Sequence, residues 1–194
     1  MYSPKHYQED RDHVIRELIS TYNFSTMISQ VEGKLTISHV PFMFEGDHLL
    51  SHLARANPHS KIFENYPQVT LIFNGPHGYI SPSWYQEHPE NVPTWNYVAV
   101  HVTGRVVIEN DPKKIETKMR SMVDGFETQN FTDWKLPHSG LENLYQQIVV
   151  FEVHDLQFEA KLKLSQNHGP VNRENVISKL ETVNPRLARM MKNS

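Results

Sequence analysis

The order of apolar and polar residues predicts one helix near the start of the chain and a series of strands after it. The apolar residues of the helix recur every three or four positions and are Val14, Ile15, Leu18, Ile19 and Tyr22. Asp10 or Asp12 can cap this helix. Strands are expected at residues 24–31, 34–44, 48–54, 69–74, 78–81 and 96–109. The first two flank Glu32-Gly33, a two-residue hairpin turn whose glycine tolerates positive φ.

The second half of the chain predicts a helix, then strands, then a closing helix. Asp111 is a good N-cap and is followed by Pro112, which suits the first helical position. Residues 148–154 and 158–164 read as one or two strands. Asn172 can cap the closing helix, which Pro185 breaks or restarts. Within the strand at 96–109, Gly104 indicates a bulge or a sharp bend.

This order of elements predicts a small, closed or half-open antiparallel barrel with peripheral helices. The chain has 194 residues, which suits one barrel domain, expected over residues 1–170, and a helical appendage over residues 171–194. Its apolar stretches are far shorter than a bilayer span, and its start lacks the apolar stretch of a signal peptide. We therefore expect a cytoplasmic protein that does not enter a membrane.

The composition excludes several kinds of chemistry. With no cysteine, the chain has no disulfide, thiolate nucleophile, Cys-ligated zinc or iron–sulfur cluster. The net charge of −3, from 19 basic and 22 acidic residues, argues against a protein that holds nucleic acid by a general basic field. The chemistry of this protein is therefore expected to be non-covalent or supplied by a cofactor.

A polar segment follows the strand predicted at residues 48–54. Ser51, Arg55, Asn57 and Lys61 lie at or just beyond the end of that strand, which Asn57-Pro58 terminates. They could form a donor-rich pocket for a phosphate, with Arg55 as a bidentate clamp. From this segment alone, a polar loop in which Arg55 makes a structural ion pair is the more common explanation.

Two further segments could line a ligand. Residues 78–85 and 92–97 are rich in Trp and Tyr, which can stack on a planar ligand, bury a subunit interface or cap the ends of a barrel. Residues 161–168 alternate like a strand and end in hydroxyl and amide groups suited to a heterocycle or a phosphate. An exposed strand end is the default explanation for this last segment.

The twelve histidines do not predict a metal site. The pattern His-Glu-x-x-His is absent, and His48 and His52 lie on one face of a strand about 13 Å apart, too far for one metal ion. Structural roles are expected for nearly all of them. Dinucleotide-binding, P-loop and serine-hydrolase motifs are also absent, and no acid–base pair or activated nucleophile is evident. Whether the protein is an enzyme is left open.

These segments together resemble the PaiB-type FMN-binding negative transcriptional regulators, a branch of the split-barrel flavin-binding proteins. The resemblance begins at Met1-Tyr2-Ser3-Pro4-Lys5-His6-Tyr7 and runs nearly end to end. It continues through His39-Val40-Pro41 and residues 51–58, 79–85, 92–97, 99–101 and 163–167. Ser51 stands where glycine is common in the family.

The resemblance implies a six-stranded antiparallel split barrel that dimerises and holds FMN in a groove between the subunits. Ser51, Arg55, Asn57 and Lys61 would approach the phosphate. The strand at residues 37–41, including His39, would run along the isoalloxazine. Trp95 and Asn96, from the same or the other subunit, would close the pocket. The rest of its polar wall would be Lys163, Gln166 and Asn167.

Three functions follow as alternatives. The first is regulation, which the family associates with protease production and sporulation control. Direct DNA binding is difficult to reconcile with the acidic chain, whose one strongly basic stretch is residues 186–192, so regulation could be indirect. The second is a flavin oxidoreductase, in which the cofactor supplies the chemistry. The third is a haem-handling protein with a histidine as axial ligand.

Overall fold

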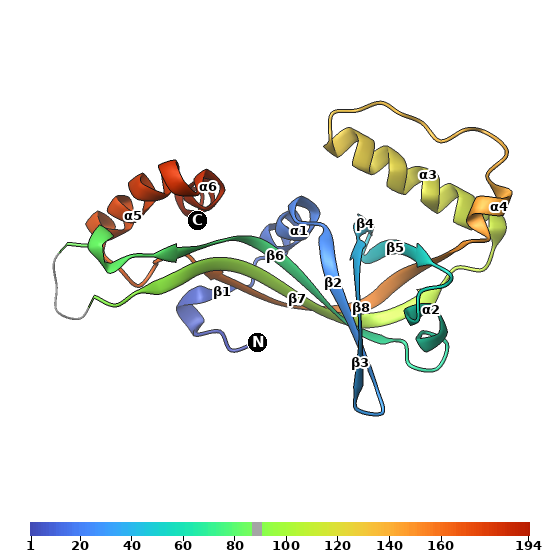
Figure 1. Cartoon of the computed structure of the whole chain (residues 1–194), viewed down its shortest axis with the longest axis horizontal. Helices are drawn as coiled ribbons and strands as arrows, with labels where there is room; N and C mark the ends of the chain where they lie inside the picture. Colours follow the sequence, from blue (N-terminus) through green and yellow to red (C-terminus); the bar gives the residue numbers. More distant parts are fainter. Residues whose placement is uncertain (87–90) are drawn as a thin grey trace. The chain divides into compact units, whose positions relative to one another are not determined.

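The protein is mainly β, with helices between and after the strands (Figure 1). A computed structural model describes residues 1–86 and 91–194. Its strands are β1 (Gln8–Glu9), β2 (Phe24–Val31), β3 (Lys34–Pro41), β4 (Met43–Glu45), β5 (His48–Ala54), β6 (Gln68–Ile80), β7 (Thr94–Ile108) and β8 (Ile148–Lys163). Its helices are α1 (Asp12–Thr21), α2 (His59–Ile62), α3 (Pro112–Gln129), α4 (Glu142–Tyr145), α5 (Pro170–Val183) and α6 (Pro185–Lys192), with 3₁₀ turns η1 (Lys5–Tyr7) and η2 (Pro82–Trp84).

The strands of the described chain form one 8-stranded sheet in the order β3-β2-β6-β7-β8-β5-β4, with β1 paired to β8. The pairings β1–β8, β2–β3, β2–β6, β4–β5 and β5–β8 are all antiparallel. This confirms the predicted fold class but corrects the strand count of six. The two additional strands are the short β1 and β4. β4 is separate from β3 because the buried Phe42 interrupts residues 34–44, which the sequence predicts as one strand.

Local sequence signals placed several boundaries correctly. Glu32 and Gly33 have φ of 49° and 80°, as a two-residue hairpin turn requires. The Asp111 side chain accepts hydrogen bonds from the N–H groups of Lys113 and Lys114 and so caps α3. Pro185 restarts the helix as α6, which the Asn184 side chain caps by accepting from the N–H of Leu187.

Other boundaries differ from the prediction. Residues 68–80 form one strand rather than two, and β8 is continuous although Asp155 has a φ of 56°. Asn172 does not cap α5, which begins at Pro170; its side chain instead accepts a hydrogen bond from the N–H of Gln86. Gly104 lies inside the continuous β7, where a Cβ would come within 2.7 Å of the carbonyl oxygen of His154. The glycine is therefore needed for close strand packing.

The chain divides into two compact units. The terminal unit comprises residues 1–19, 74–101 and 159–194, and the central unit comprises residues 20–73 and 102–158. The central unit contains a group of packed aromatic rings, in which Phe42 lies 6.0 Å from both Phe73 and Phe151. A second cluster packs α3 onto β5 and β8 through Met119, Met122, Leu50 and Val150.

The terminal unit buries the apolar faces of its two C-terminal helices. The buried residues of α5 and α6 are Val176, Ile177, Leu180, Leu187, Ala188 and Met191. Gly78 lies against this region, because a Cβ there would be 3.0 Å from a methyl carbon of Leu187. Among the described residues, no helix is both long enough and apolar enough to cross a membrane.

Candidate functional site

In the central unit, Arg55 has both a structural contact and spare donors. It directly follows β5, and its side chain is exposed. Its Nε donates to the carbonyl oxygen of Gln146 at 2.8 Å, and its Nη2 donates to that of Ile148 at 2.7 Å. A guanidinium has five N–H groups, so about three remain for another acceptor. The predicted phosphate clamp is thus held in place by the backbone and still offers cationic donors.

The space beside the Arg55 side chain could admit a small ligand. A cavity of about 300 Å³ lies there, also lined by Lys113, Arg120, Glu116 and Tyr145. Arg120 is paired to Glu116 at 2.7 Å. An anion that reaches Arg55 through this cavity therefore meets Arg55 and Lys113 as its main cationic partners.

Asn57 belongs to a buried network below the same segment. Its Nδ2 donates to Ser38 Oγ at 3.0 Å, and its Oδ1 accepts from the backbone N–H of His59 at 3.0 Å. Ser38 Oγ also lies 2.8 Å from Nδ1 of His59. Burial lowers the pKa of His59, and its Nε2 has no hydrogen-bond partner. The network fixes the chain direction after β5.

Ser51 and Lys61 differ in how far their side chains are exposed to solvent. Ser51 is fully buried, and its hydroxyl donates to the carbonyl oxygen of Pro41 at 2.7 Å. Lys61 is exposed, and no ion pair holds it within the described residues. We call residues 54–61 the β5 segment. Of its predicted site residues, Arg55 and Lys61 present free donors.

His39 lies on β3, the strand at one end of the sheet order. Its Nδ1 is 3.2 Å from Oγ1 of Thr26, its partner across the β2–β3 pair, and its ring stacks 6.4 Å from that of Phe24. Phe24, Leu35 and Ile37 on the same hairpin are 64%, 60% and 55% exposed. The central unit therefore carries an exposed apolar surface beside a strand edge that has no strand partner among the described residues.

In the terminal unit, Asn96 is an internal residue. It is 1% exposed, and its Nδ2 donates to Ser165 Oγ at 2.9 Å. Its neighbour Trp95 is 55% exposed and packs edge-on to Tyr79 with ring centres 6.1 Å apart. The side chains of these two consecutive β7 residues differ in solvent exposure because successive residues of a strand point to opposite faces of the sheet.

Residues 163–168, which we call the β8 segment, make most of their polar side-chain contacts within the protein. Lys163 donates to Oγ1 of Thr94 and to the carbonyl oxygen of Trp95. Burial, and then the nearby Lys161, lowers the pKa of Lys163. Gln166 bonds to the backbone of Leu162 and Leu164, and Asn167 accepts from the hydroxyl of Tyr7 at 3.0 Å. The segment holds Trp95 and Tyr7 in place.

The predicted site residues thus fall into two sets, each assembled within its own unit. His39, Ser51, Arg55, Asn57 and Lys61 belong to the central unit, and Trp95, Asn96, Lys163, Gln166 and Asn167 belong to the terminal unit. Sequence reasoning missed Ser38, His59, Ser165 and Tyr7, which anchor these residues. Ser38 and His59 adjoin the segments 39–41 and 51–58, but their contacts join positions 21 residues apart and carry no local signal.

Two solved structures of flavin-binding proteins share this fold. The flavocytochrome Anf3 of Azotobacter vinelandii matches with a TM-score of 0.64 at 17% identity, over 84% of this chain and 71% of that one. A FAD and heme binding protein of Mycobacterium smegmatis also matches with a TM-score of 0.64, at 14% identity, over 89% of this chain and 80% of that one. At these identities the likeness shows the fold, which confirms the split-barrel class.

The family follows from the sequence match. This chain belongs to the family described as "Putative FMN-binding domain", whose sequence model matches residues 1–154. It is 35% identical over 189 residues to "Protease synthase and sporulation protein PAI 2" of Bacillus subtilis (strain 168), over 93% of this chain and 89% of that protein. The predicted family is confirmed, and with it the prediction that the cofactor is FMN.

Proposed function

We propose that the protein binds FMN and acts as a negative regulator that affects protease production and sporulation. The observation that carries this proposal is the 35% identity to the Bacillus subtilis protein over 93% of the chain, which includes both polar segments of the candidate site. The FMN-binding family and the split-barrel fold support the cofactor. Bound FMN would supply one- or two-electron redox chemistry.

The donor chemistry of the β5 segment fits the phosphate of FMN. Arg55 is held at its Nε and Nη2 by two carbonyl groups, so its remaining N–H groups are oriented before a ligand arrives. Lys61 in the same segment and Lys113 in the cavity beside Arg55 are further exposed cations. Charge-assisted hydrogen bonds from such groups to a phosphate are shorter and about twice as strong as neutral ones. We propose that Arg55 and Lys61 hold the phosphate, while Asn57 and Ser51 shape the backbone that carries them.

The isoalloxazine would use a strand edge and an aromatic ring. One side of the β3 backbone lacks a strand partner in the described sheet, and residues 37–41 could pair with the polar edge of the flavin. Trp95 is exposed and can stack on a planar ring. Lys163 would hold the Trp95 region in position, and Gln166 and Asn167 would hold the adjoining backbone and Tyr7.

We propose that the protein is a homodimer with FMN near the subunit interface. Phe24, Leu35 and Ile37 expose more than half of their surface on a hairpin whose outer strand is an edge. Such an apolar edge is prone to pair with another chain unless something covers it. A second copy is the covering that the resemblance implies.

The dimer is tested by Ile37→Lys, which places a charge in the apolar surface. Light scattering after gel filtration should give a dimer mass for the wild type and a monomer mass for this variant. Val107→Lys, at a 37%-exposed position of β7, is the matched control and should remain dimeric. A monomeric wild type, or a dimeric Ile37→Lys, would contradict this interface.

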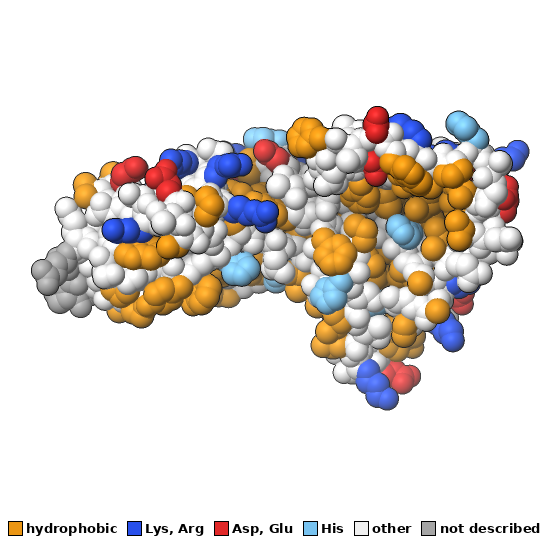
Figure 2. Space-filling model, turned by 45° about the horizontal axis from the view of Figure 1, so that its top comes forward, with side chains coloured by type: hydrophobic (Ala, Val, Ile, Leu, Met, Phe, Trp, Pro, Cys, Tyr) orange, Lys and Arg blue, Asp and Glu red, His pale blue; other side chains and the backbone are white. Residues whose placement is uncertain are grey.

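The charge distribution favours regulation without a general DNA-binding surface. The chain carries a net charge of −3, and Lys192 in the basic stretch at residues 186–192 is paired to Glu181. On the face drawn in Figure 2, the described Lys and Arg side chains are interspersed with Asp and Glu and do not gather into one large patch. We therefore propose that regulation is indirect, through a partner protein or through the redox state of the flavin.

An absorption spectrum of the purified protein is the first test. Flavin bands would support the proposal, and a Soret band would favour haem instead. Bleaching of the flavin by NAD(P)H with turnover of an acceptor would favour a flavin oxidoreductase. A salt-dependent mobility shift on promoter DNA would show direct regulation, contrary to the indirect route.

Arg55→Ala tests the phosphate site. Flavin fluorescence titrations should compare FMN with riboflavin, which lacks the phosphate. We expect FMN to bind at least about 10-fold more weakly, because a hydrogen bond to a charged group contributes about 1.5–3 kcal/mol, whereas riboflavin binding should hardly change. Arg105→Ala removes a surface arginine paired to Asp155 and is the matched control. Equal losses for both flavins would place the phosphate elsewhere.

A further inference from the structure

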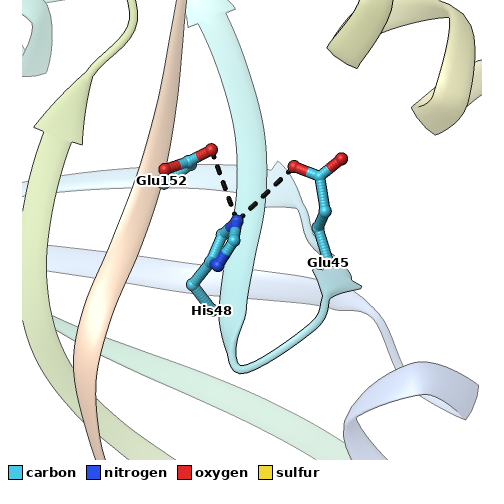
Figure 3. A group of neighbouring side chains, drawn as sticks. All are labelled: Glu45, His48 and Glu152. Atoms are coloured by element: carbon cyan, nitrogen blue, oxygen red, sulfur yellow. Dashed lines mark hydrogen bonds and ion pairs between the residues drawn. The ribbon is translucent and has the colours of Figure 1, made fainter.

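A group of metal-ligating side chains lies in the central unit among residues that the flavin proposal does not use. Glu45, His48 and Glu152 come from the end of β4, the start of β5 and the middle of β8 (Figure 3). The β4–β5 turn pairs Glu45 with His48, and the β5–β8 pairing places Leu50 opposite Glu152. The sheet register therefore brings together ligands that are about a hundred residues apart in the chain.

The ligand atoms all lie within 4.8 Å of one another, and two of their three distances suit one small cation. Nε2 of His48 lies 3.4 Å from Oε2 of Glu45 and 3.3 Å from Oε1 of Glu152. Figure 3 shows the imidazole pointing between the two carboxylates. Zn–N and Zn–O bonds of about 2.0–2.2 Å in a tetrahedron place neighbouring ligand atoms about 3.3–3.5 Å apart. Charge-assisted N–H···O bonds are instead about 2.7–2.9 Å long, and one N–H group cannot point along both directions.

The outer contacts of this group match those of metal ligands. The other nitrogen of His48, Nδ1, lies 3.2 Å from Oδ1 of Asp47, which favours the tautomer with the proton on Nδ1 and a lone pair on Nε2. The second oxygen of Glu152 lies 2.7 Å from Nε2 of His154. Ligating histidines and carboxylates are commonly oriented by such second partners.

The charge balance also leaves room for a cation. Glu45, Glu109 and Glu152 share one ammonium, that of Lys118, which contacts Glu152 and lies 3.4 Å from Glu109 and 3.9 Å from Glu45. Three carboxylates therefore face one ammonium group. When a metal ion takes Glu152, Lys118 still has Glu109 as a partner.

We propose that Glu45, His48 and Glu152 bind a divalent transition-metal ion such as Zn²⁺, with water completing the coordination. Imidazole and carboxylate ligands suit this ion, and three protein ligands leave a position open. The side chains of His48 and Glu152 are 17% and 13% exposed, so the site is sheltered yet reachable from solvent. The ion would tie the β4–β5 turn to β8. This site is separate from the proposed flavin contacts.

The experiment uses the full chain, stripped of metal with a chelator and then titrated with Zn²⁺ by calorimetry. We expect one tight site in the wild type. His48→Gln and Glu152→Gln should each weaken it by more than about 100-fold, because loss of an outer partner alone costs about 10–100-fold. His154→Gln should fall within that outer-partner range. Co²⁺ should give the visible absorption of a four-coordinate ion in the wild type and not in His48→Gln.

His13→Gln is the matched control, because His13 is exposed on α1 and lies outside the cluster. It should keep the tight site, which separates the cluster from adventitious binding among twelve histidines. Thermal unfolding without metal checks that each variant folds. Added Zn²⁺ should raise the unfolding temperature of the wild type and of His13→Gln, but not that of His48→Gln. No one-site binding by the wild type, or unchanged binding by His48→Gln, would overturn the proposal.

Lys118→Met separates a metal site from a cluster of ion pairs alone. Removing the competing ammonium should tighten Zn²⁺ binding by about tenfold or more, because a unit charge at about 4 Å repels the incoming cation. A cluster that serves only as an ion-pair network would lose stability in this variant and gain no affinity for Zn²⁺. Unchanged affinity would therefore count against the proposed ligand set.

Discussion

The β5 segment and the β8 segment have similar compositions and opposite uses of their polar groups. Each follows a long run of strand residues and contains lysine, amide and hydroxyl side chains. In the β5 segment, Arg55 and Lys61 are exposed and keep donors free. In the β8 segment, Lys163, Gln166 and Asn167 are all bonded within the protein. Gln166 and Asn167 are exposed as well, so internal hydrogen bonds, rather than burial or residue type, distinguish the two segments.

Because only the β5 segment keeps cationic donors free, we expect the two segments to act on the cofactor in different ways. A free cation binds a phosphate directly, whereas an internally bonded lysine fixes the backbone of an aromatic residue. In the terminal unit that residue is Trp95, whose carbonyl oxygen accepts from Lys163 at 2.6 Å. We therefore expect the β5 segment to contribute binding energy for the phosphate and the β8 segment to position Trp95.

The largest expected effect comes from removing the positive charges of the β5 segment, compared with removing that of Lys163 in the β8 segment. Removing both Arg55 and Lys61 in Arg55→Ala/Lys61→Ala should weaken FMN binding by more than about 100-fold, since each charge-assisted bond contributes about 1.5–3 kcal/mol. Lys163→Met should leave FMN affinity within about threefold but lower the free energy of unfolding by about 1–3 kcal/mol, because the Trp95 carbonyl group loses its donor. Fluorescence titration and urea unfolding measure the two quantities.

That comparison fails if Lys163→Met weakens FMN binding as strongly as the double variant while its unfolding free energy stays at the wild-type value. Lys163 would then contact the cofactor directly, as the family resemblance implies.

The next effect concerns the internal polar contacts of the terminal unit. Asn96→Leu leaves the Ser165 hydroxyl without its buried partner and should lower the free energy of unfolding by about 1–3 kcal/mol. Asn65→Leu, at an exposed position of the central unit, should change it by less than about 0.5 kcal/mol. Urea unfolding followed by circular dichroism gives both values. Equal values for the two variants would show that Asn96 is not an internal anchor.

The smallest effect is a loss of stability in acid. Burial lowers the pKa of His59, and burial followed by Lys163 lowers that of His168. The unfolded chain then binds more protons than the folded one below about pH 6.5, so stability falls with falling pH by up to about 1.4 kcal/mol per pH unit for each group. His59→Asn and His168→Asn should each flatten this slope in unfolding curves recorded from pH 7 to 5.

An unchanged slope in either variant would show that the corresponding imidazole is not kept neutral by the fold. Since His59 anchors the β5 segment and His168 belongs to the β8 segment, the two slopes report separately on the two regions.

Much of the fold could be predicted because its signals are local. The Glu32-Gly33 turn, the Asp111 cap and the break at Pro185 depend on residues within a few positions of one another. Whether a strand continues without interruption was harder to predict from the sequence. The sequence predicts an interruption at residues 75–77, yet these residues remain in β6 because backbone pairing depends on neighbours that are distant in sequence. Asn172 was read as a cap, but its side chain bonds to Gln86.

The candidate sites likewise contain residues that could be predicted from the sequence and residues whose roles could not. Arg55 and Lys61 could be selected from their residue types at a strand end. The roles of Ser51 and Asn96 could not, because an internal hydroxyl or amide looks the same in sequence as a ligand-binding one. The absence of a metal motif was judged from His48 and His52 on one strand, whereas the proposed ligands of His48 come from β4 and β8.

By itself, the sequence determined the family, the FMN cofactor, the Glu32-Gly33 turn, the Asp111 cap, the helix break at Pro185 and the exclusion of cysteine chemistry. These properties depend on residue identity or on contacts within a few positions. Only the tertiary structure decided which polar groups remain free, how Lys163 and Asn96 are held, and that Glu45, His48 and Glu152 meet. Those outcomes depend on strand pairing and burial, which join distant residues and which no local pattern encodes.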